Sequence, residues 1–387
     1  MNTINLHAIF VNYIKKFELI NNPEYNENYK WKIAAKFHDL IDPASPRFKT
    51  GIGEAWKLSD NLIDSVNRYC FSALVTCVQK DEEAVRAIFR DLFAYDGGDL
   101  AIRQEKILAF IAKANELTAK HHSTNGMFMN DQRSAMAYLF LNDPDNHYLY
   151  KYTEAFNVAS CIEYFDDWGS GPDFRLDVYY RMCDLIVEEI RKDDALLKTH
   201  QSRFYDSNGN LIPDMYPDKN YHILTFDIIY GAPGNRYNFY DGIPFSPITT
   251  SARKLHEERL EKAKMLYAQM EKARLDAELY REAVQYYAQL LPVGGPVTHK
   301  TFGSGTVISY TEGQTGDTVK VRFESTNDVK SFAAANAILG GFLLVDAADI
   351  CEKNAKYKEI ISKNNLLLQS ALKKAEQDFE PYKDCLE

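Results

Sequence analysis

The sequence has none of the cysteine patterns that mark a zinc site or a disulfide framework. Its few cysteines lie far apart, and no two of them form a C-x-x-C pair. They stand at positions 70, 77, 161, 183, 351 and 385. Scattered thiols of this kind are typical of reduced, mostly buried cysteines in a cytosolic protein. The sequence therefore predicts a cytoplasmic protein without a structural metal.

Long apolar runs are also missing. No segment approaches the ~20 consecutive apolar residues of a membrane-spanning helix, and Met1–Asn5 lacks the basic and apolar parts of a signal peptide. We therefore expect no membrane partner. Acidic residues exceed basic ones by 55 to 45, which gives a net charge of −10. This excess argues against non-specific coating of nucleic acid, although it is compatible with a local basic groove.

The common catalytic motifs are absent as well. The chain has no G-x-x-x-x-G-K-[ST] loop for nucleoside triphosphates and no G-x-S-x-G elbow for a serine nucleophile. It has one His-Asp dipeptide, His38-Asp39, with His7 before it and His121-His122 after it. Metal-dependent hydrolases of the HD type use such residues to bind a divalent metal. We expect a non-enzymatic protein without a cofactor, and an HD-type hydrolase using His38 and Asp39 is the alternative.

Apolar and aromatic residues are abundant, at 45% and 13% of the chain, and they can form a large core. Apolar spacings of three and four predict that residues 1–245 form one mainly helical domain. Tyr148–Tyr152 alternates like a strand, Tyr221–Tyr230 fits helix or strand equally well, and the loop 231–249 marks the domain boundary. The expected helices are Leu6–Phe17, Asn26–Ile41, Ile52–Val66, Asp81–Phe93, Leu100–Ala119, Asp131–Leu141 and Val178–Lys192.

Residues 252–292 predict one long coiled helix. Its small and apolar residues step alternately by three and four from Ala263 to Leu291, as in the seam of a coiled coil. Residues 349–380 predict a second, C-terminal coiled helix, in which Asn364 falls on the seam and would fix the register. We expect the two helices to pack antiparallel within the chain. A homodimer through these heptad helices, or a partner bound to them, is the alternative.

Between the two coiled helices, residues 296–345 predict a small, strongly bent β-barrel with glycines at its corners. Its strand Thr318–Phe323 alternates three apolar residues with Lys320 and Arg322. Successive side chains of a strand point to opposite faces. This strand is therefore expected to direct its apolar side chains to the core and its two cations to the outside.

The stretch that begins at Val297 follows the pattern V-x-H-x-x-F-G-x-G-x-V, with His299, Phe302, Gly303 and Gly305 at its fixed positions. This pattern resembles the SH3-like (Tudor-like) module at the C-terminus of some DNA helicases. The resemblance implies a module that binds polymerase subunits, other proteins or nucleic acid and does not catalyse. The candidate binding residues here are His299, Lys300, Lys320 and Arg322.

The phrases Phe17–Tyr25, Val85–Phe93, Tyr148–Thr153 and Asp177–Asp184 resemble the N-terminal helical domain of McrB-type restriction proteins in bacterial defence. The resemblance covers roughly residues 5–240 and implies binding of DNA or a protein partner. The motor of that class is missing from this chain. The candidate contacts are Lys30, Lys32, Arg47, Lys49 and Arg86 for phosphates, and Trp31 and Trp56 for stacking.

These observations predict a mainly α protein with a small all-β SH3-like barrel. A helical N-terminal domain comes first, and a coiled helical hairpin that carries the barrel follows. The expected function is that of a non-enzymatic interaction or adaptor protein in bacterial DNA processing or phage defence. Its expected partner is a protein, and nucleic acid is the alternative partner.

Overall fold

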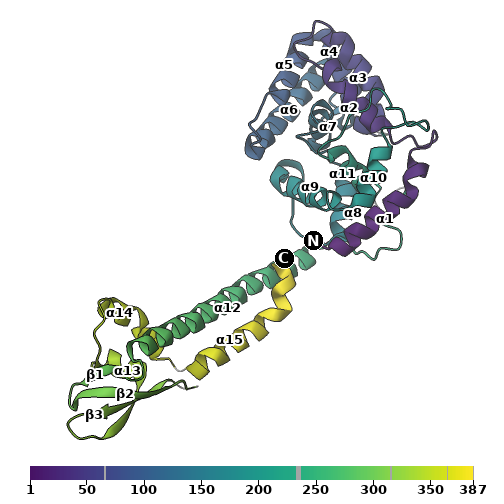
Figure 1. Cartoon of the computed structure of the whole chain (residues 1–387). Helices are drawn as coiled ribbons and strands as arrows, with labels where there is room; N and C mark the ends of the chain where they lie inside the picture. Colours follow the sequence, from purple (N-terminus) through teal and green to yellow (C-terminus); the bar gives the residue numbers. More distant parts are fainter. Residues whose placement is uncertain (65–66, 232–236, 314–315, 364, 387) are drawn as a thin grey trace. The chain divides into compact units, whose positions relative to one another are not determined.

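The chain divides into two compact units, Met1–Arg253 and Lys254–Glu387. The first unit is helical, and the second combines helices with one small antiparallel sheet. The predicted mainly α class with a small β module is therefore confirmed. No helix among the described residues is long and apolar enough to cross a membrane. The computed structural model in Figure 1 describes residues 1–64, 67–231, 237–313, 316–363 and 365–386.

The predicted helices of the first unit all form, with ends within a few residues of those expected from the sequence. The helix expected at Ile52–Val66 ends at Ile63, and Val66 lies outside the described residues. Additional helices that the sequence pattern did not indicate are α4, α8 and α10. The helices of this unit are α1 (Thr3–Ile20), α2 (Tyr29–Leu40), α3 (Phe48–Ile63), α4 (Cys70–Lys80), α5 (Glu82–Phe93), α6 (Leu100–His121), α7 (Gln132–Asn142), α8 (Tyr152–Cys161), α9 (Leu176–Ile190), α10 (Asp194–Ser202) and α11 (His222–Tyr230).

The strand predicted at Tyr148–Tyr152 is wrong. Residues 148–151 pair with no strand in the described parts of the chain, and Tyr152 begins α8. The backbone there bonds to side chains of α9 instead. The Tyr179 hydroxyl donates to the Leu149 carbonyl at 2.6 Å, and the Tyr148 N–H donates to the Tyr180 hydroxyl at 3.3 Å. These hydrogen bonds satisfy backbone N–H and C=O groups of a buried extended segment that belongs to no sheet. The alternating pattern of one segment does not show whether a partner strand lies beside it.

Helix α7 lies at the centre of the first core, because every side chain from Ser134 to Leu141 is buried. Tyr138 contacts the rings of Phe71, Phe89 and Phe110 at centroid distances of 5.1, 5.2 and 5.5 Å. Edge-to-face contacts of this kind add to the stabilisation that burial alone provides. A helix that is apolar all round is a buried helix, and here it supports the helices around it.

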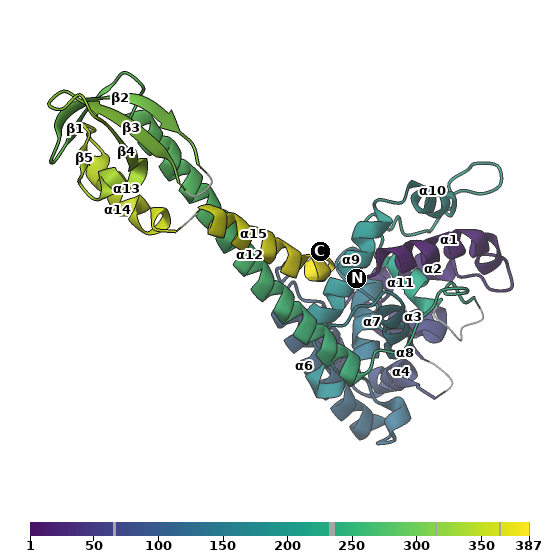
Figure 2. The ribbon, with the colours of Figure 1, turned by 90° about the horizontal axis from the view of Figure 1, so that it is seen from below.

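The second unit contains an antiparallel helical hairpin, as predicted. Helix α12 (Thr250–Leu290) runs beside α14 (Ile350–Ile361) and α15 (Asn365–Phe379), and both views show α15 along α12 (Figures 1 and 2). Tyr267 contacts Phe379 at 5.4 Å, and farther along α12 Asp276 pairs with Lys363 at 2.8 Å. The helix expected at 349–380 is thus two helices. Asn364, expected on the seam, lies outside the described residues.

The sheet of the second unit is curled but does not close into the predicted barrel. Its strand order is β4-β3-β2-β1-β5, so β4 and β5 are its edges. Gly305 permits close strand packing, because a Cβ there would lie 2.8 Å from the carbonyl oxygen of Arg322. The short helix α13 (Ala334–Leu339) separates the last two strands. The strands are β1 (Pro296–His299), β2 (Gly303–Thr311), β3 (Thr318–Phe323), β4 (Val329–Ala333) and β5 (Leu343–Leu344).

Candidate functional site

Two residues predicted to contact DNA lie inside the first unit. Lys30 and Trp31, on α2, are both fully buried. The Lys30 ammonium pairs with the carboxylates of Glu27, at 2.7 Å, and Asp227. The Trp31 ring lies against the guanidinium of Arg203, whose central carbon is 3.6 Å from the ring centroid. Neither side chain can reach a phosphate or a base, because each is enclosed by the core that it helps to form.

Burial and neighbouring charges shift the pKa values of several ionisable groups in this core. Burial opposes the charge on Lys30, but the carboxylates of Asp227 and Glu27 outweigh burial and raise the pKa of the ammonium. Burial raises the pKa of Asp218 to about 7, although two backbone N–H groups at the start of α11 donate to it. Burial also lowers the pKa of His200, which is 3.6 Å from Asp218, to about 3. These groups lie inside the core and present no charge to a ligand.

The other predicted contacts of the first unit lie at or near the surface. Lys32 is exposed on α2, Arg47 is exposed just before α3, and Lys49 is half-buried in the first turn of α3. Arg47 pairs with Glu54 at 3.5 Å. Arg86 donates to two carbonyls of the loop between α2 and α3, so it fastens α5 to that loop. The structure thus leaves Lys32, Arg47 and Lys49 as separate surface cations.

The His-Asp dipeptide of the alternative prediction lies on α2. His38 and Asp39 are exposed, and Nδ1 of His38 is 3.1 Å from Oδ1 of Asn142. His121 lies 3.7 Å from Asp81 instead of near His38. Within the described ranges, no three His, Cys, Asp or Glu side chains lie close enough together to hold a metal ion. The HD-type alternative therefore has no assembled set of ligands in this part of the chain.

The outer face of β3 carries the two cations that the alternation predicted. Lys320 and Arg322 are exposed, while the apolar residues between and beside them are buried. The register places hydroxyl side chains on β2 beside them, and Ser331 and Val329 on β4. The ion pairs found among the described residues of this unit lie elsewhere, and none includes Lys320 or Arg322. Both cations are therefore available to a partner.

His299, predicted as a binding residue, is buried in the sheet core. Its Nδ1 accepts the backbone N–H groups of Thr301 and Phe302 at 3.0 and 3.2 Å, which closes the turn between β1 and β2. Its ring lies 4.6 Å from that of Phe302 and 5.1 Å from that of Phe332. Lys300, the next residue, is exposed. The His-x-x-Phe spacing of the sequence thus reflects a turn, and Lys300 is the residue of this pair that a partner can reach.

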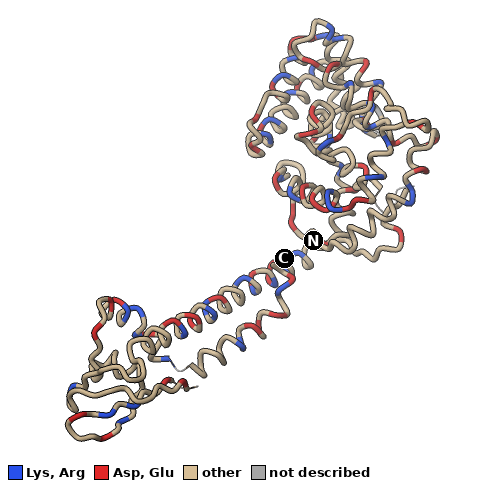
Figure 3. The backbone as a smooth tube through the Cα atoms, viewed as in Figure 1, with Lys and Arg blue, Asp and Glu red and all other residues tan. Residues whose placement is uncertain are grey.

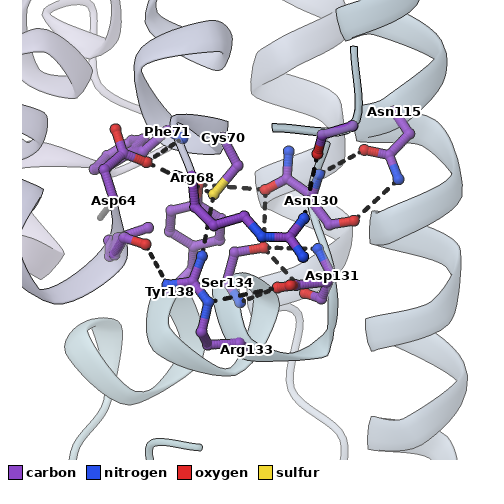
Figure 4. A network of polar contacts seen from close by, with 12 residues as sticks. Asp64, Arg68, Cys70, Phe71, Asn115, Asn130, Asp131, Arg133, Ser134 and Tyr138 are labelled. Carbon is purple, nitrogen blue, oxygen red and sulfur yellow. Dashed lines mark hydrogen bonds and ion pairs between the residues drawn. The ribbon is translucent and has the colours of Figure 1, made fainter. Parts of the chain in front are cut away.

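A polar network in the first unit fixes the starts of α4 and α7 (Figure 4). The carboxylate of Asp64 accepts the backbone N–H of Phe71 at 2.9 Å and the indole N–H of Trp56 at 3.1 Å. Trp56, predicted to stack on bases, is therefore half-buried and held by Asp64. Asn115 and Asn130 exchange two hydrogen bonds of 2.7 and 3.0 Å. These contacts position the residues around the start of α7, which line a cavity.

The cavity beside this network has a volume of about 470 Å³. Arg133, on α7, lines one side; its guanidinium donates to the carbonyl of Ile63 and lies 3.9 Å from the carboxylate of Asp131. Arg68 is an exposed lining residue and donates to the carbonyl of Gly126 at 3.2 Å. The cavity thus brings together two guanidinium groups that are far apart in the sequence.

The first turn of α8 also lines the cavity. Lys151 precedes this turn, and its ammonium lies 4.7 Å from the centroid of the Tyr230 ring. Burial lowers the pKa of Lys151 to about 8; Glu154 opposes this shift, and the positive charges of Lys30 and Arg133 add to it. The sequence alone gives no signal for this site, because each of its cations stands alone in the sequence and no local pattern connects them.

Charge along the backbone is mixed in both units, with Lys and Arg interspersed among Asp and Glu (Figure 3). Function must therefore be inferred from local arrangements of side chains and not from a broad basic surface. Comparison with protein families, curated proteins and solved structures finds no match to this chain. The two resemblances found in the sequence therefore stay predictions.

Proposed function

We propose that the protein is a non-enzymatic adaptor that docks the outer face of its small sheet on an anionic partner, in bacterial DNA processing or phage defence. The observation that carries this proposal is the pair of exposed cations on β3, Lys320 and Arg322. No ion pair with a described residue neutralises them, so their charge can steer and orient a partner. Lys300, exposed directly after β1, adds a third cation to the same unit.

The resemblance of Val297–Val307 to the Tudor-like module of DNA helicases supports this proposal, because such modules bind other molecules through an SH3-like fold. Assignment of the curled sheet to that fold is part of the proposal. The resemblance of residues 5–240 to the McrB-type N-terminal domain supports the context of DNA processing or defence. A homodimer is not included, since the seam residues Ala277 and Tyr287 of α12 are buried within the chain.

The number of cations favours a protein with an acidic patch over nucleic acid as the partner. For each phosphate that a protein neutralises on duplex DNA, the binding constant falls by about 0.9 logarithmic units per tenfold rise in salt concentration. Two or three cations neutralise few phosphates, so they supply only a weak salt dependence and a modest affinity. The net charge of −10 further opposes a long contact with nucleic acid. A compact acidic surface on a protein requires no more than a few well-placed cations.

The test is capture of partners from the native host by the full chain and by a charge-reversed variant. Lys320→Glu with Arg322→Glu is expected to reduce specific capture about tenfold, because attraction becomes repulsion across the interface. The matched control is Lys373→Glu with Lys374→Glu, which reverses two exposed charges on α15. Equal losses in both variants would contradict the proposal, because net charge alone would then explain them. Capture that disappears after nuclease treatment would identify nucleic acid as the bridge.

A further inference from the structure

We propose that the cavity beside α8 binds a nucleoside 5′-phosphate, either free or at the end of a nucleic-acid strand. This site belongs to the first unit and does not depend on the outer face of the sheet. Its volume of about 470 Å³ lies within the range of small-ligand sites and is too small for a duplex. Three features of its walls define the ligand: two guanidinium groups, the start of a helix and an exposed aromatic ring.

The two guanidinium groups suit a phosphate. Arg133 is held by the carbonyl of Ile63 and by Asp131, so its orientation is fixed before a ligand arrives. Arg68 is exposed and forms no ion pair with any described carboxylate. Guanidinium groups bind phosphate oxygens through charge-assisted, often bidentate hydrogen bonds. Arg133 and the exposed Arg68 can therefore both donate to one phosphate.

The start of α8 adds backbone donors to the same wall. No side chain of the described residues caps this helix, and the carbonyl of Lys151 accepts the N–H of Ala155 at 2.9 Å. The N–H groups of residues 152–154 thus lie at an uncapped positive helix end that lines the cavity. Anions bind well at such helix ends, where backbone N–H groups lack partners and the helix dipole is positive.

The charges that line the cavity sum to a positive value. Arg68, Arg133 and Lys151 supply three cations, and Asp131 and Glu154 supply two carboxylates. The Asp131 carboxylate is already engaged, because it caps α7 by accepting the backbone N–H of Ser134 at 3.0 Å. The cavity therefore favours an anion, and a single phosphate group matches its small net charge.

An aromatic wall suits the base of the nucleotide. Tyr152 is 53% exposed, and its ring lies parallel to that of Phe156 with a centroid distance of 6.1 Å. Phe174 and Tyr150 form a buried, apolar part of the lining, with ring centroids 4.8 Å apart. Planar bases stack on exposed aromatic rings with little dependence on sequence. Phosphate and base recognition thus occur on neighbouring walls of one cavity.

Calorimetric titration of the full chain with deoxyadenosine 5′-phosphate, deoxyadenosine and inorganic phosphate tests the proposal. The nucleotide is expected to bind at least about tenfold more tightly than either part alone, because both walls contribute. Arg68→Glu and Tyr152→Ala should each weaken nucleotide binding by about tenfold. Matched controls are Lys219→Glu, an exposed residue that does not line the cavity, and Tyr95→Ala, which is 92% exposed.

Single-stranded oligonucleotides with a 5′-phosphate or a 5′-hydroxyl distinguish the two sources of the ligand. Tighter binding of the phosphorylated strand identifies a strand end, whereas binding of the mononucleotide alone identifies a free nucleotide. Absence of nucleotide binding, or equal affinity in the wild type and Arg68→Glu, would overturn the proposal. The Lys320→Glu, Arg322→Glu variant should bind nucleotide normally, so failure of this site and failure of the docking face are separate results.

Discussion

The two units differ in how deeply their ion pairs are buried. In the first, Lys30 and Arg203 are withdrawn almost completely from water, and both pair with the buried carboxylate of Asp227. In the second, the pair Asp276–Lys363 joins α12 to the segment between α14 and α15, and both partners keep contact with water. A helical unit built around a buried central helix encloses charge and must neutralise it there. In the second unit the core is apolar, and the ion pairs between α12 and the helices beside it keep contact with water.

The largest effect that distinguishes the units is expected for Lys30→Met. This change removes the ammonium from two buried carboxylates, those of Glu27 and Asp227, and leaves Arg203 as the one described cation paired with Asp227. Breaking a buried pair by removing one partner costs about 3–5 kcal/mol. Urea unfolding of the full chain, followed by fluorescence, is expected to show the first unit destabilised by that amount.

The matched control for this comparison is Lys363→Met in the second unit. Its partner Asp276 keeps contact with water, and surface pairs contribute about 0–1 kcal/mol. The midpoint of unfolding should therefore move little. If both lysine variants shifted the midpoint equally, the contrast between a charge-enclosing core and a surface-charged hairpin would be lost.

A second prediction concerns backbone packing in the sheet. Gly305→Ala places a Cβ 2.8 Å from the Arg322 carbonyl oxygen and equally close to the side chains of Val321 and Phe323. Overpacking of this kind costs about 1–3 kcal/mol, because strands β2 and β3 must separate. In contrast, Gly53→Ala on α3 meets no atom within 4 Å and is expected to stabilise the first unit by about 0.5–1 kcal/mol. Thermal unfolding measures both changes, and equal destabilisation by the two substitutions would contradict this reading of the packing.

A third prediction uses pH. Because burial raises the pKa of Asp218 to about 7, the folded state holds a proton that the unfolded state releases above about pH 4. The stability provided by the protonated acid is present below that pH and is lost as the pH rises through 7. Asp218→Asn keeps a neutral group throughout, so the variant should lose less stability than the wild type between pH 5 and pH 8.

Urea midpoints at the two pH values measure this difference. His200, whose pKa is lowered, gives the opposite pH dependence below its ordinary pKa, but it does so in both proteins. Because His200 lies 3.6 Å from Asp218, the difference between the two proteins reports the titration of Asp218 together with any change that its replacement causes at His200. A constant difference between wild type and variant at pH 5 and pH 8 would show that Asp218 is already ionised in the folded state at pH 5.

The spacing of apolar residues predicted the helices well, but it did not show which cations are accessible to a ligand. The helix expected at Asp81–Phe93 forms as α5, and Asp81 caps it by accepting the Ala84 N–H at 3.2 Å. Apolar spacing did not show that Lys30 is buried and Lys32 is exposed, although both lie on one predicted helix. Lys30 is buried because Asp227, 197 residues later, lies beside it, whereas Lys32 has no such partner among the described residues.

In the second unit, too, local pattern predicted which way side chains point but not how the strands assemble. The alternation along β3 correctly placed Lys320 and Arg322 on the outside, because strand geometry depends only on neighbouring residues. Closure into a barrel did not follow, since it requires the edge strands β4 and β5 to meet, and they do not pair. The turn that encloses His299 also depends on Phe332, which comes from another strand.

The periodic elements of this protein follow from local sequence: the amphipathic helices, the seam of the hairpin and the two faces of β3. They depend on side chains within about one turn or one strand pair of each other. Three features follow instead from the folded arrangement: which cations are buried, whether the sheet closes, and that Arg68, Arg133 and the first turn of α8 share one cavity. Burial and cavity formation depend on contacts between distant segments, and no local spacing encodes them.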